Sequence, residues 1–282
     1  MTTPVFLAVI LAALLHATWN AVVKGGGDKH VSMAAVVIGH LPFALLVLPF
    51  VPAPDKASLP YLGAGIALHF GYQLFLLHSY KAGDLTQVYP IARGSAPLLV
   101  AAISVLFLGV TLQAVELTAI AIIGIGILSI SLTRYQTGQR NPRGAGLALI
   151  TGCFIAAYSL VDGTGARVAS TPLGFYGWLA IGNAAVMAAF MATTSPGTLL
   201  RVARDAKRVF FLGGAASFGA YALVMWAFTK APIPLVTALR ESSILFALII
   251  GVVFLREKLN PAKLASTAFT LVGIALLRLA KP

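Results

Sequence analysis

The sequence contains few charged residues. Only 10% of its 282 positions are Asp, Glu, Lys or Arg, against about 25% in soluble domains. Hydrophobic residues make up 59% of the chain, and its mean hydropathy is +0.92. The scarcity of charge excludes a soluble globular domain, and the hydrophobic content excludes an intrinsically disordered chain. The chain is therefore expected to be embedded in lipid.

Acidic residues and cysteine are also scarce. Eight acids oppose 20 Lys and Arg, which gives a net charge of +12. No soluble module is present to bind nucleic acid, so the basic residues are expected in cytoplasmic loops against anionic lipid. The single Cys153 excludes an internal disulfide and paired-Cys metal motifs. His16, His40, His69 and His78 form no known ligand motif, so neither a metal nor a cofactor is expected.

The apolar runs are long and lack the alternating polarity of a transmembrane β-barrel. The first run has no basic segment before it, so we interpret it as a retained helix rather than a cleaved signal. A spanning helix needs roughly 20 residues, and Gly, Pro and charged residues separate ten such stretches. The sequence thus predicts an all-α polytopic membrane protein with ten transmembrane helices. These are Pro4–Val23, Val31–Val51, Leu59–Tyr80, Thr86–Leu108, Ala114–Leu132, Gly144–Val161, Pro172–Thr193, Val209–Phe228, Leu235–Leu255 and Ala262–Leu279.

An internal repeat divides the chain. Shifting Tyr89–Leu132 by 147 residues onto Val236–Leu279 makes 13 of 44 positions identical without a gap. The matched pairs include an intramembrane arginine, Arg93 and Arg240, each followed two residues later by serine. A weaker match relates Trp19 to Tyr158.

Each repeat unit holds five helices, an odd number, so the second copy enters from the opposite side of the membrane. We therefore expect two inverted repeats, residues 1–135 and 144–282, joined by a polar linker at 136–143. Many secondary transporters use this arrangement, with the substrate near mid-depth between the halves.

Arg93 and Arg240 are the first candidate site residues. Burying an arginine in the membrane costs on the order of 2.5–3.5 kcal/mol, and its guanidinium can hold a carboxylate with two hydrogen bonds. The two arginines are expected to anchor an anionic substrate group, unless they snorkel or pair with Glu241. Glu241, the only acid well inside a predicted helix, either carries a coupling proton or neutralises an arginine. Two arginines and one acid would leave the interior with one excess positive charge.

Polar and aromatic residues supply the other candidates. His69, Tyr72, Gln73 and Tyr80 form one face of the third helix, which must face protein or water. They line a cavity or make hydrogen bonds between helices. The candidate substrate-binding residues beyond the arginines are Trp19, Asn20, Tyr72, Gln73, Tyr89, Tyr158 and Tyr221. Pro90 and Pro97 can kink the fourth helix and so serve a gate or hinge.

Several segments together resemble one known family. They are HATWNAVVKGG at 16–26, DLTQVYPIARGSAPLL at 84–99, LFLGVTL at 106–112, VTALRESSILF at 236–246 and FLREKLNPAKL at 254–264. The chain resembles the drug/metabolite transporter superfamily, in its ten-helix EamA branch, over essentially its whole length. The family commonly carries an acid after the fourth helix, where this chain has Val110. The resemblance implies a cavity lined by helices one, three, four, six, eight and nine.

The expected function is secondary transport of a small polar metabolite by alternating access. The resemblance favours efflux of an amino acid, with an aromatic one suited to the aromatic candidates and a carboxylate suited to the arginines. Uptake or exchange of another small organic anion or phosphonate is the alternative, and an intramembrane enzyme a remote one. Proton coupling is left open, as is the choice between a monomer and a homodimer.

The distribution of Lys and Arg predicts the orientation in the bacterial inner membrane. The loops after the odd-numbered helices hold 13 basic residues, and the opposite side holds five. Because basic loops stay in the cytoplasm, both termini are expected in the periplasm.

Overall fold

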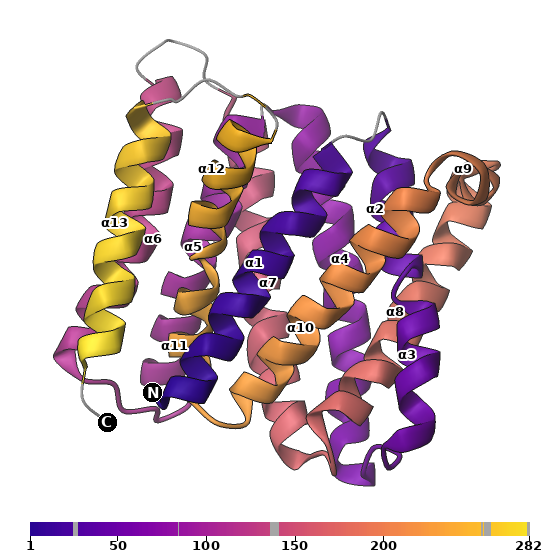
Figure 1. Cartoon of the computed structure of the whole chain (residues 1–282), viewed down its shortest axis with the longest axis horizontal. Helices are drawn as coiled ribbons and strands as arrows, with labels where there is room; N and C mark the ends of the chain where they lie inside the picture. The colour runs from indigo at the N-terminus through magenta and orange to yellow at the C-terminus, as the bar shows by residue number, and fades with distance from the viewer. Residues whose placement is uncertain (25–27, 84, 136–140, 255, 257–260, 281–282) are drawn as a thin grey trace.

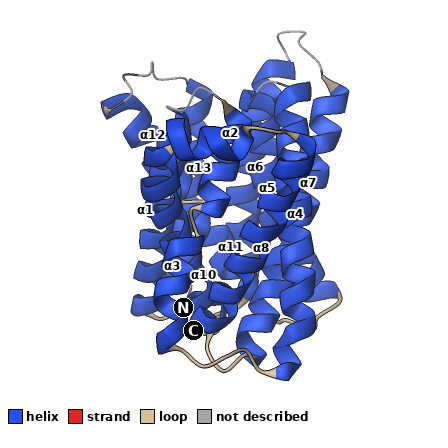
Figure 2. Cartoon of the chain, turned by 90° about the vertical axis from the view of Figure 1, so that its right-hand side faces the viewer, coloured by secondary structure: helices blue, strands red, loops and turns tan. Residues whose placement is uncertain are grey.

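The computed structural model describes residues 1–24, 28–83, 85–135, 141–254, 256 and 261–280. Every long element in these ranges is a helix, and they contain no strand (Figure 2). In the first half the helices are α1 (Thr3–Lys24), α2 (Lys29–Ile38), α3 (Leu41–Val47), α4 (Leu59–Ala82), α5 (Leu85–Leu106) and α6 (Ala114–Tyr135), with 3₁₀ turns at Leu48–Phe50 and Lys56–Ser58. In the second half they are α7 (Pro142–Val168), α8 (Pro172–Thr194), α9 (Thr198–Asp205), α10 (Gly214–Phe228), α11 (Ile233–Arg240), α12 (Ser243–Val253) and α13 (Pro261–Leu279), with a π-helical turn at Val209–Gly213.

Nine helical stretches within the described ranges are long and apolar enough to cross a membrane. α4 is not among them because His69, Gln73 and His78 lower its hydropathy, but it is 24 residues long and runs the length of the bundle (Figure 1). With α4, the described chain makes the ten expected passes. The protein is thus an all-helical, multi-pass membrane protein.

Four details of the predicted helices are wrong. The second stretch breaks at Gly39–His40, where Pro42 cannot donate a hydrogen bond back to Ile38. The ninth breaks between Arg240 and Ser243. The sixth does not end at Val161 but continues to Val168. The segment 195–208, expected to be a polar loop, contains the short helix α9.

The two ends of the chain lie at the same end of the bundle (Figure 1). Arg278 near the end of α13 donates a hydrogen bond to the Thr3 hydroxyl over 2.9 Å. Most of the basic residues that the structure describes lie at the opposite end, where α1, α4, α6, α8 and α12 end.

Helices of the two halves pack against each other in matching pairs. α4 packs along α7, and α1 packs along α10 in the same way. α5 packs on α6 as α12 does on α13, while α6 and α13 lie side by side at one edge of the molecule (Figure 1). Exchanging the two halves turns the α4–α7 pair into the α10–α1 pair, as the symmetry of an inverted repeat requires. The proposed repeat boundaries stay a prediction, and residues 136–140 of the predicted linker lie outside the described residues.

The break after α2 packs directly on the start of α10. A Cβ atom added to Gly214 would lie 2.5 Å from the carbonyl oxygen of Gly39, and one added to Gly39 would lie 2.3 Å from that of Phe210. Backbone atoms cannot move aside as a flexible side chain can, so both glycines are needed for this approach.

Gly214→Ala is therefore expected to lower the stability of the folded protein by about 1–3 kcal/mol, the usual cost of overpacking. Gly219→Ala on the same helix is the control, because the nearest atom to its new Cβ would be 3.5 Å away, an ordinary contact. Thermal unfolding in detergent measures the difference. Equal melting temperatures for the two variants would contradict the close approach.

Candidate functional site

A cavity of about 90 Å³ lies between α1, α2, α10 and α11 on one side and α4, α7 and α8 on the other. Six of the predicted site residues line it: Trp19, Tyr72, Gln73, Tyr158, Tyr221 and Arg240. They come from five helices that are far apart in the sequence. Four other predicted residues, Asn20, Tyr89, Arg93 and Glu241, lie outside its lining.

Arg93 and Glu241 form an ion pair that joins the two halves of the chain. The Arg93 Nε donates to Glu241 Oε2 over 3.1 Å, and Nη2 lies 2.9 Å from Oε1. Both side chains are buried. A buried charge is tolerated when it is paired and hydrogen-bonded, so each residue makes the burial of the other acceptable. Of the two open readings of Glu241, this geometry favours neutralisation of an arginine, and the arginine is Arg93.

Arg240 occupies the matching position in the second half but has different surroundings. Its guanidinium carbon lies 5.4 Å from the centre of the Tyr221 ring, a cation–π contact. Its buried Nη1 has no hydrogen-bond partner within the described part of the chain. Arg240 is therefore a lining residue of the cavity with one unused donor, whereas the charge of Arg93 is already neutralised.

Asp162 is a site residue that the sequence analysis missed. Its side chain is fully buried, and its Oδ2 lies 2.7 Å from His69 Nε2 and accepts a hydrogen bond from the Tyr221 hydroxyl over 2.6 Å. The prediction that Glu241 is the only acid well inside a helix was wrong, because α7 continues past Val161 to Val168 and therefore contains Asp162. Asp followed by Gly at 162 and 163 resembles a helix end. In the structure α7 continues through both residues, and Asp162 binds His69 of α4 and Tyr221 of α10.

The excess positive charge expected of the interior is corrected as well. The buried charged side chains in the described ranges are Arg93, Arg240, Glu241 and Asp162, two of each sign. Tyr221 connects Asp162 and Arg240, because its hydroxyl binds the first and its ring faces the second.

The helix break after Arg240 lies at this site. Glu241 and Ser242 donate backbone hydrogen bonds to Ala238 and Leu239, three residues back, instead of the usual four. Such a tight turn inside a spanning helix often marks a functional hinge. It also orients Glu241 toward Arg93 while Arg240 lines the cavity.

Aromatic rings pack around the Asp162 cluster, which consists of Asp162, His69 and Tyr221. The His69 ring stacks on Tyr158 with centroids 4.2 Å apart, and Tyr72 contacts Tyr158 edge to face at 5.6 Å. Two amide oxygens at the cavity, Oε1 of Gln73 and Oδ1 of Asn183, are buried and have no hydrogen-bond partner among the residues described. The residues that line the cavity therefore include a cation, two amides with an unpaired oxygen and several aromatic rings.

Trp19 and Asn20 of α1 share a partner, and the two predicted prolines lie in α5. Trp19 donates from Nε1 to His16 Nδ1 over 3.2 Å, and Asn20 donates to the His16 carbonyl over 2.8 Å. Pro90 and Pro97 lie inside α5, whose helix continues through both of them, and their role as a hinge stays a prediction. No group of three His, Cys, Asp or Glu side chains in the described ranges could hold a metal ion.

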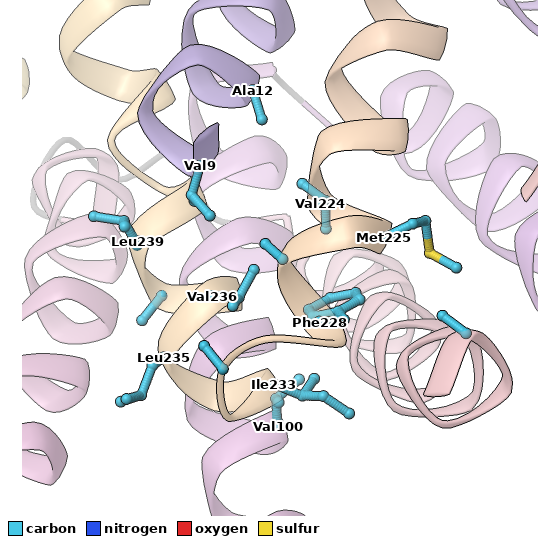
Figure 3. Packing of buried hydrophobic residues seen from close by; sticks show 14 of the residues in the cluster. Val9, Ala12, Val100, Val224, Met225, Phe228, Ile233, Leu235, Val236 and Leu239 are labelled. Atoms are coloured by element: carbon cyan, nitrogen blue, oxygen red, sulfur yellow. The ribbon is translucent and has the colours of Figure 1, made fainter. Parts of the chain in front are cut away.

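Apolar residues close the cavity toward the termini. Val9 and Ala12 of α1, Val224 and Phe228 of α10, and Val236 of α11 pack together (Figure 3). Ala12 and Val224 line the cavity, while Val9 and Phe228 lie nearer the end of the bundle that holds the termini. On the other side, the lining residues Trp19 and Met33 lie near the opposite end, whereas Tyr176, near the start of α8, lies toward the termini. The cavity thus lies at mid-depth in the bundle.

Comparison with known proteins identifies the family. The EamA-like transporter family matches residues 3–132 and again residues 142–279. This chain belongs to the EamA-like transporter family. It is accordingly a membrane transporter of the drug/metabolite transporter superfamily, as the sequence resemblance predicted. A solved structure described only as "Crystal structure of protein" has a TM-score of 0.74 and 18% identity, with both chains covered completely, and supports the fold. None of the curated proteins compared with the chain matches it.

The Arg93–Glu241 pair generates a prediction about the folding of this EamA-like transporter. Arg93→Gln or Glu241→Gln alone leaves a buried charge without its partner, a loss of about 3–5 kcal/mol. The double variant Arg93→Gln/Glu241→Gln removes both charges and should recover most of the folded yield. Size-exclusion profiles after mild heating in detergent measure this yield. A double variant no better than the worse single variant would contradict the pairing.

Proposed function

We propose that this EamA-like transporter exports a small amino acid from the cytoplasm by alternating access. The observation that carries the proposal is the unused, buried Nη1 of Arg240 at the cavity wall. A guanidinium binds a carboxylate with charge-assisted hydrogen bonds, and Arg93 is occupied by Glu241. Arg240 is therefore the anchor that we assign to the substrate carboxylate.

The two free amide oxygens support an amino acid over a simple organic anion or a phosphonate. Gln73 Oε1 and Asn183 Oδ1 can only accept hydrogen bonds, and an ammonium group is a strong donor. A zwitterion satisfies Arg240 and these acceptors together, whereas an anion without an amine leaves the acceptors unpaired, which costs about 1–3 kcal/mol each.

The position of the cavity between helices of both halves supports alternating access. It is lined by α1, α2 and α4 of the first half and by α7, α8, α10 and α11 of the second. We propose that these helices move relative to one another to load and release the amino acid. Aromatic rings on the wall give the side chain of the substrate an apolar surface. We propose no catalytic activity, because members of the family are transporters.

The basic residues and the apolar cluster support loading from the cytoplasm. The end of the bundle opposite the termini carries most of the basic residues, and basic loops remain cytoplasmic. We therefore propose that the termini face the periplasm and that this conformation is closed toward it by the apolar cluster around Val9, Val224 and Phe228.

Arg240→Gln should lower the apparent affinity for the transported amino acid at least about tenfold, because a hydrogen bond to a charged group contributes about 1.5–3 kcal/mol. Arg240→Lys keeps the charge but loses the planar fork and should recover only part of the affinity. Uptake of a panel of labelled amino acids, carboxylates and phosphonates by proteoliposomes provides the measurement. Arg278→Gln, on an exposed part of α13, is the control. Full affinity in Arg240→Gln, or a substrate without an amine, would refute the assignment.

The orientation is tested separately with reporters fused before Met1 and after Pro282. Because both termini lie at one end of the bundle (Figure 1), the two fusions should behave alike. An enzyme that is active only in the periplasm should report from both positions. Activity solely from a cytoplasmic reporter would reverse the orientation and place the loading side outside.

A further inference from the structure

The cluster around Asp162 has no role in the proposed recognition of the substrate. Asp162 itself does not line the cavity. Its Oδ1 faces α4, where a Cβ added to Gly65 would lie 2.5 Å away, and this oxygen has no hydrogen-bond partner among the described residues. Between Asp162 and the cavity lie its two partners, His69 and Tyr221, both of which line the wall.

We propose that the His69–Asp162 pair carries a proton that this transporter exchanges for its substrate. The proposal rests on the proposed function for the identity of the substrate, and it moves the coupling role from Glu241 to Asp162. Glu241 is held by a charged partner, whereas the partners of Asp162 are an imidazole and a phenol. Histidine is the side chain whose ordinary titration range lies nearest neutral pH.

The geometry defines the proton-binding atom. When Asp162 is ionised, it can only accept hydrogen bonds, so the Nε2 at 2.7 Å must carry the hydrogen. Neutral His69 then has Nδ1 as its free acceptor. A hydronium ion in the cavity gives up a proton to Nδ1, so one O–H bond breaks, the Nδ1–H bond forms and water remains. On the other side of the membrane the Nδ1–H bond breaks and the proton returns to water as hydronium. The protonated pair has no net charge, and the deprotonated pair has one negative charge.

Titratable groups approach the pair from each neighbouring helix that carries one. Tyr158 of α7 stacks on His69, and Tyr221 of α10 donates to Asp162. Tyr176 of α8 lies edge to face against Tyr221 at 5.2 Å. His40, at the break between α2 and α3, also lines the cavity and lies edge to face against Tyr176 at 6.4 Å. The guanidinium carbon of Arg240 of α11 lies 5.4 Å from the centre of the Tyr221 ring, while Arg93 of α5 is paired with Glu241. Arg240 is thus the one of these cations that lacks a carboxylate partner in the described chain, and Tyr221 links it to Asp162.

This arrangement makes proton and substrate compete. Gln73 lies one helical turn after His69 on the same face of α4. An ammonium group held by Gln73 Oε1 would lie beside the His69 ring and repel an imidazolium. The negative charge of the pair is neutralised either by the proton or by the ammonium, so binding of one releases the other. Such competition is what exchange of a proton for an amino acid requires, and it fits export driven by an inward proton gradient.

The experiment uses the full chain in proteoliposomes that contain a pH-sensitive dye. The probe is a mixture of labelled neutral amino acids added outside. In the wild type, entry of amino acid should drive protons out and raise the internal pH. Asp162→Asn and His69→Gln should each reduce this proton flux at least tenfold, while exchange of labelled for unlabelled amino acid continues. His78→Gln is the control, since His78 is an exposed histidine of α4 that binds only the Leu74 carbonyl in its own helix.

A second pair of variants keeps every titratable group. Gly65→Ala would press on Asp162 Oδ1 and on Leu179, 2.9 Å from the added Cβ, whereas Gly63→Ala meets no atom within 4 Å. Gly65→Ala should lower the ratio of protons to amino acids moved, and Gly63→Ala should leave it unchanged. These variants test the pair even where Asp162→Asn does not fold.

Three results would overturn the proposal. The first is wild-type amino acid transport without proton movement, and the second is an unchanged proton flux in both Asp162→Asn and His69→Gln. The third is loss of coupling in a Glu241→Gln variant that still exchanges labelled amino acid, while Asp162→Asn and His69→Gln stay coupled. If the wild type moves no amino acid, the proposed function fails, and infrared titration of the purified protein then tests the pair by itself. A titrating carboxyl or imidazole band that is absent from Asp162→Asn and His69→Gln supports the pair. A wild-type spectrum without such a band contradicts it.

Discussion

The structure depends on the requirement that every charge buried in the membrane find a partner. Arg93 and Glu241 meet this requirement across the two halves of the chain, at 2.9 Å, on helices that the inverted arrangement brings together. Once Glu241 is used by Arg93, the other arginine has no carboxylate in direct contact in the described structure and lies against Tyr221 instead. That difference between two matching arginines gives the cavity its positive end. It also leaves Asp162 to His69 and Tyr221.

The inverted repeat explains both the similarity of the halves and this difference. Arg93 and Arg240 match at the offset of 147 residues, but the residue after Arg93 is Gly94 and the residue after Arg240 is Glu241. One acid therefore serves two arginines and can pair with only one of them. Gly94 packs against the α6 backbone at Gly124, where an acid would not fit. The asymmetry that gives the cavity its chemistry thus depends on the difference between Gly94 and Glu241 at matching positions of the repeat.

Hydropathy and the repeat were enough to predict the ten passes, because long apolar runs in lipid can only be helices. They also predicted six residues of the cavity wall, since polar stripes on such helices must face inward. The helix break after Arg240 could not be predicted, as no Pro or Gly marks it. Asp162 was missed for a related reason: Asp followed by Gly reads as a helix end, and only its contacts with His69 and Tyr221 reveal why α7 continues. Which arginine pairs with Glu241 depends on helix packing, and the sequence treats the two alike.

A structure of the transporter with its substrate bound tests the central claim most directly. The account predicts the substrate carboxylate within hydrogen-bond distance of the Arg240 guanidinium, its amine near Gln73 and Asn183, and the Arg93–Glu241 pair intact. A carboxylate bound to Arg93 with Glu241 displaced would contradict it, because the ion pair would then be a switch at the substrate site and not the constraint that frees Arg240.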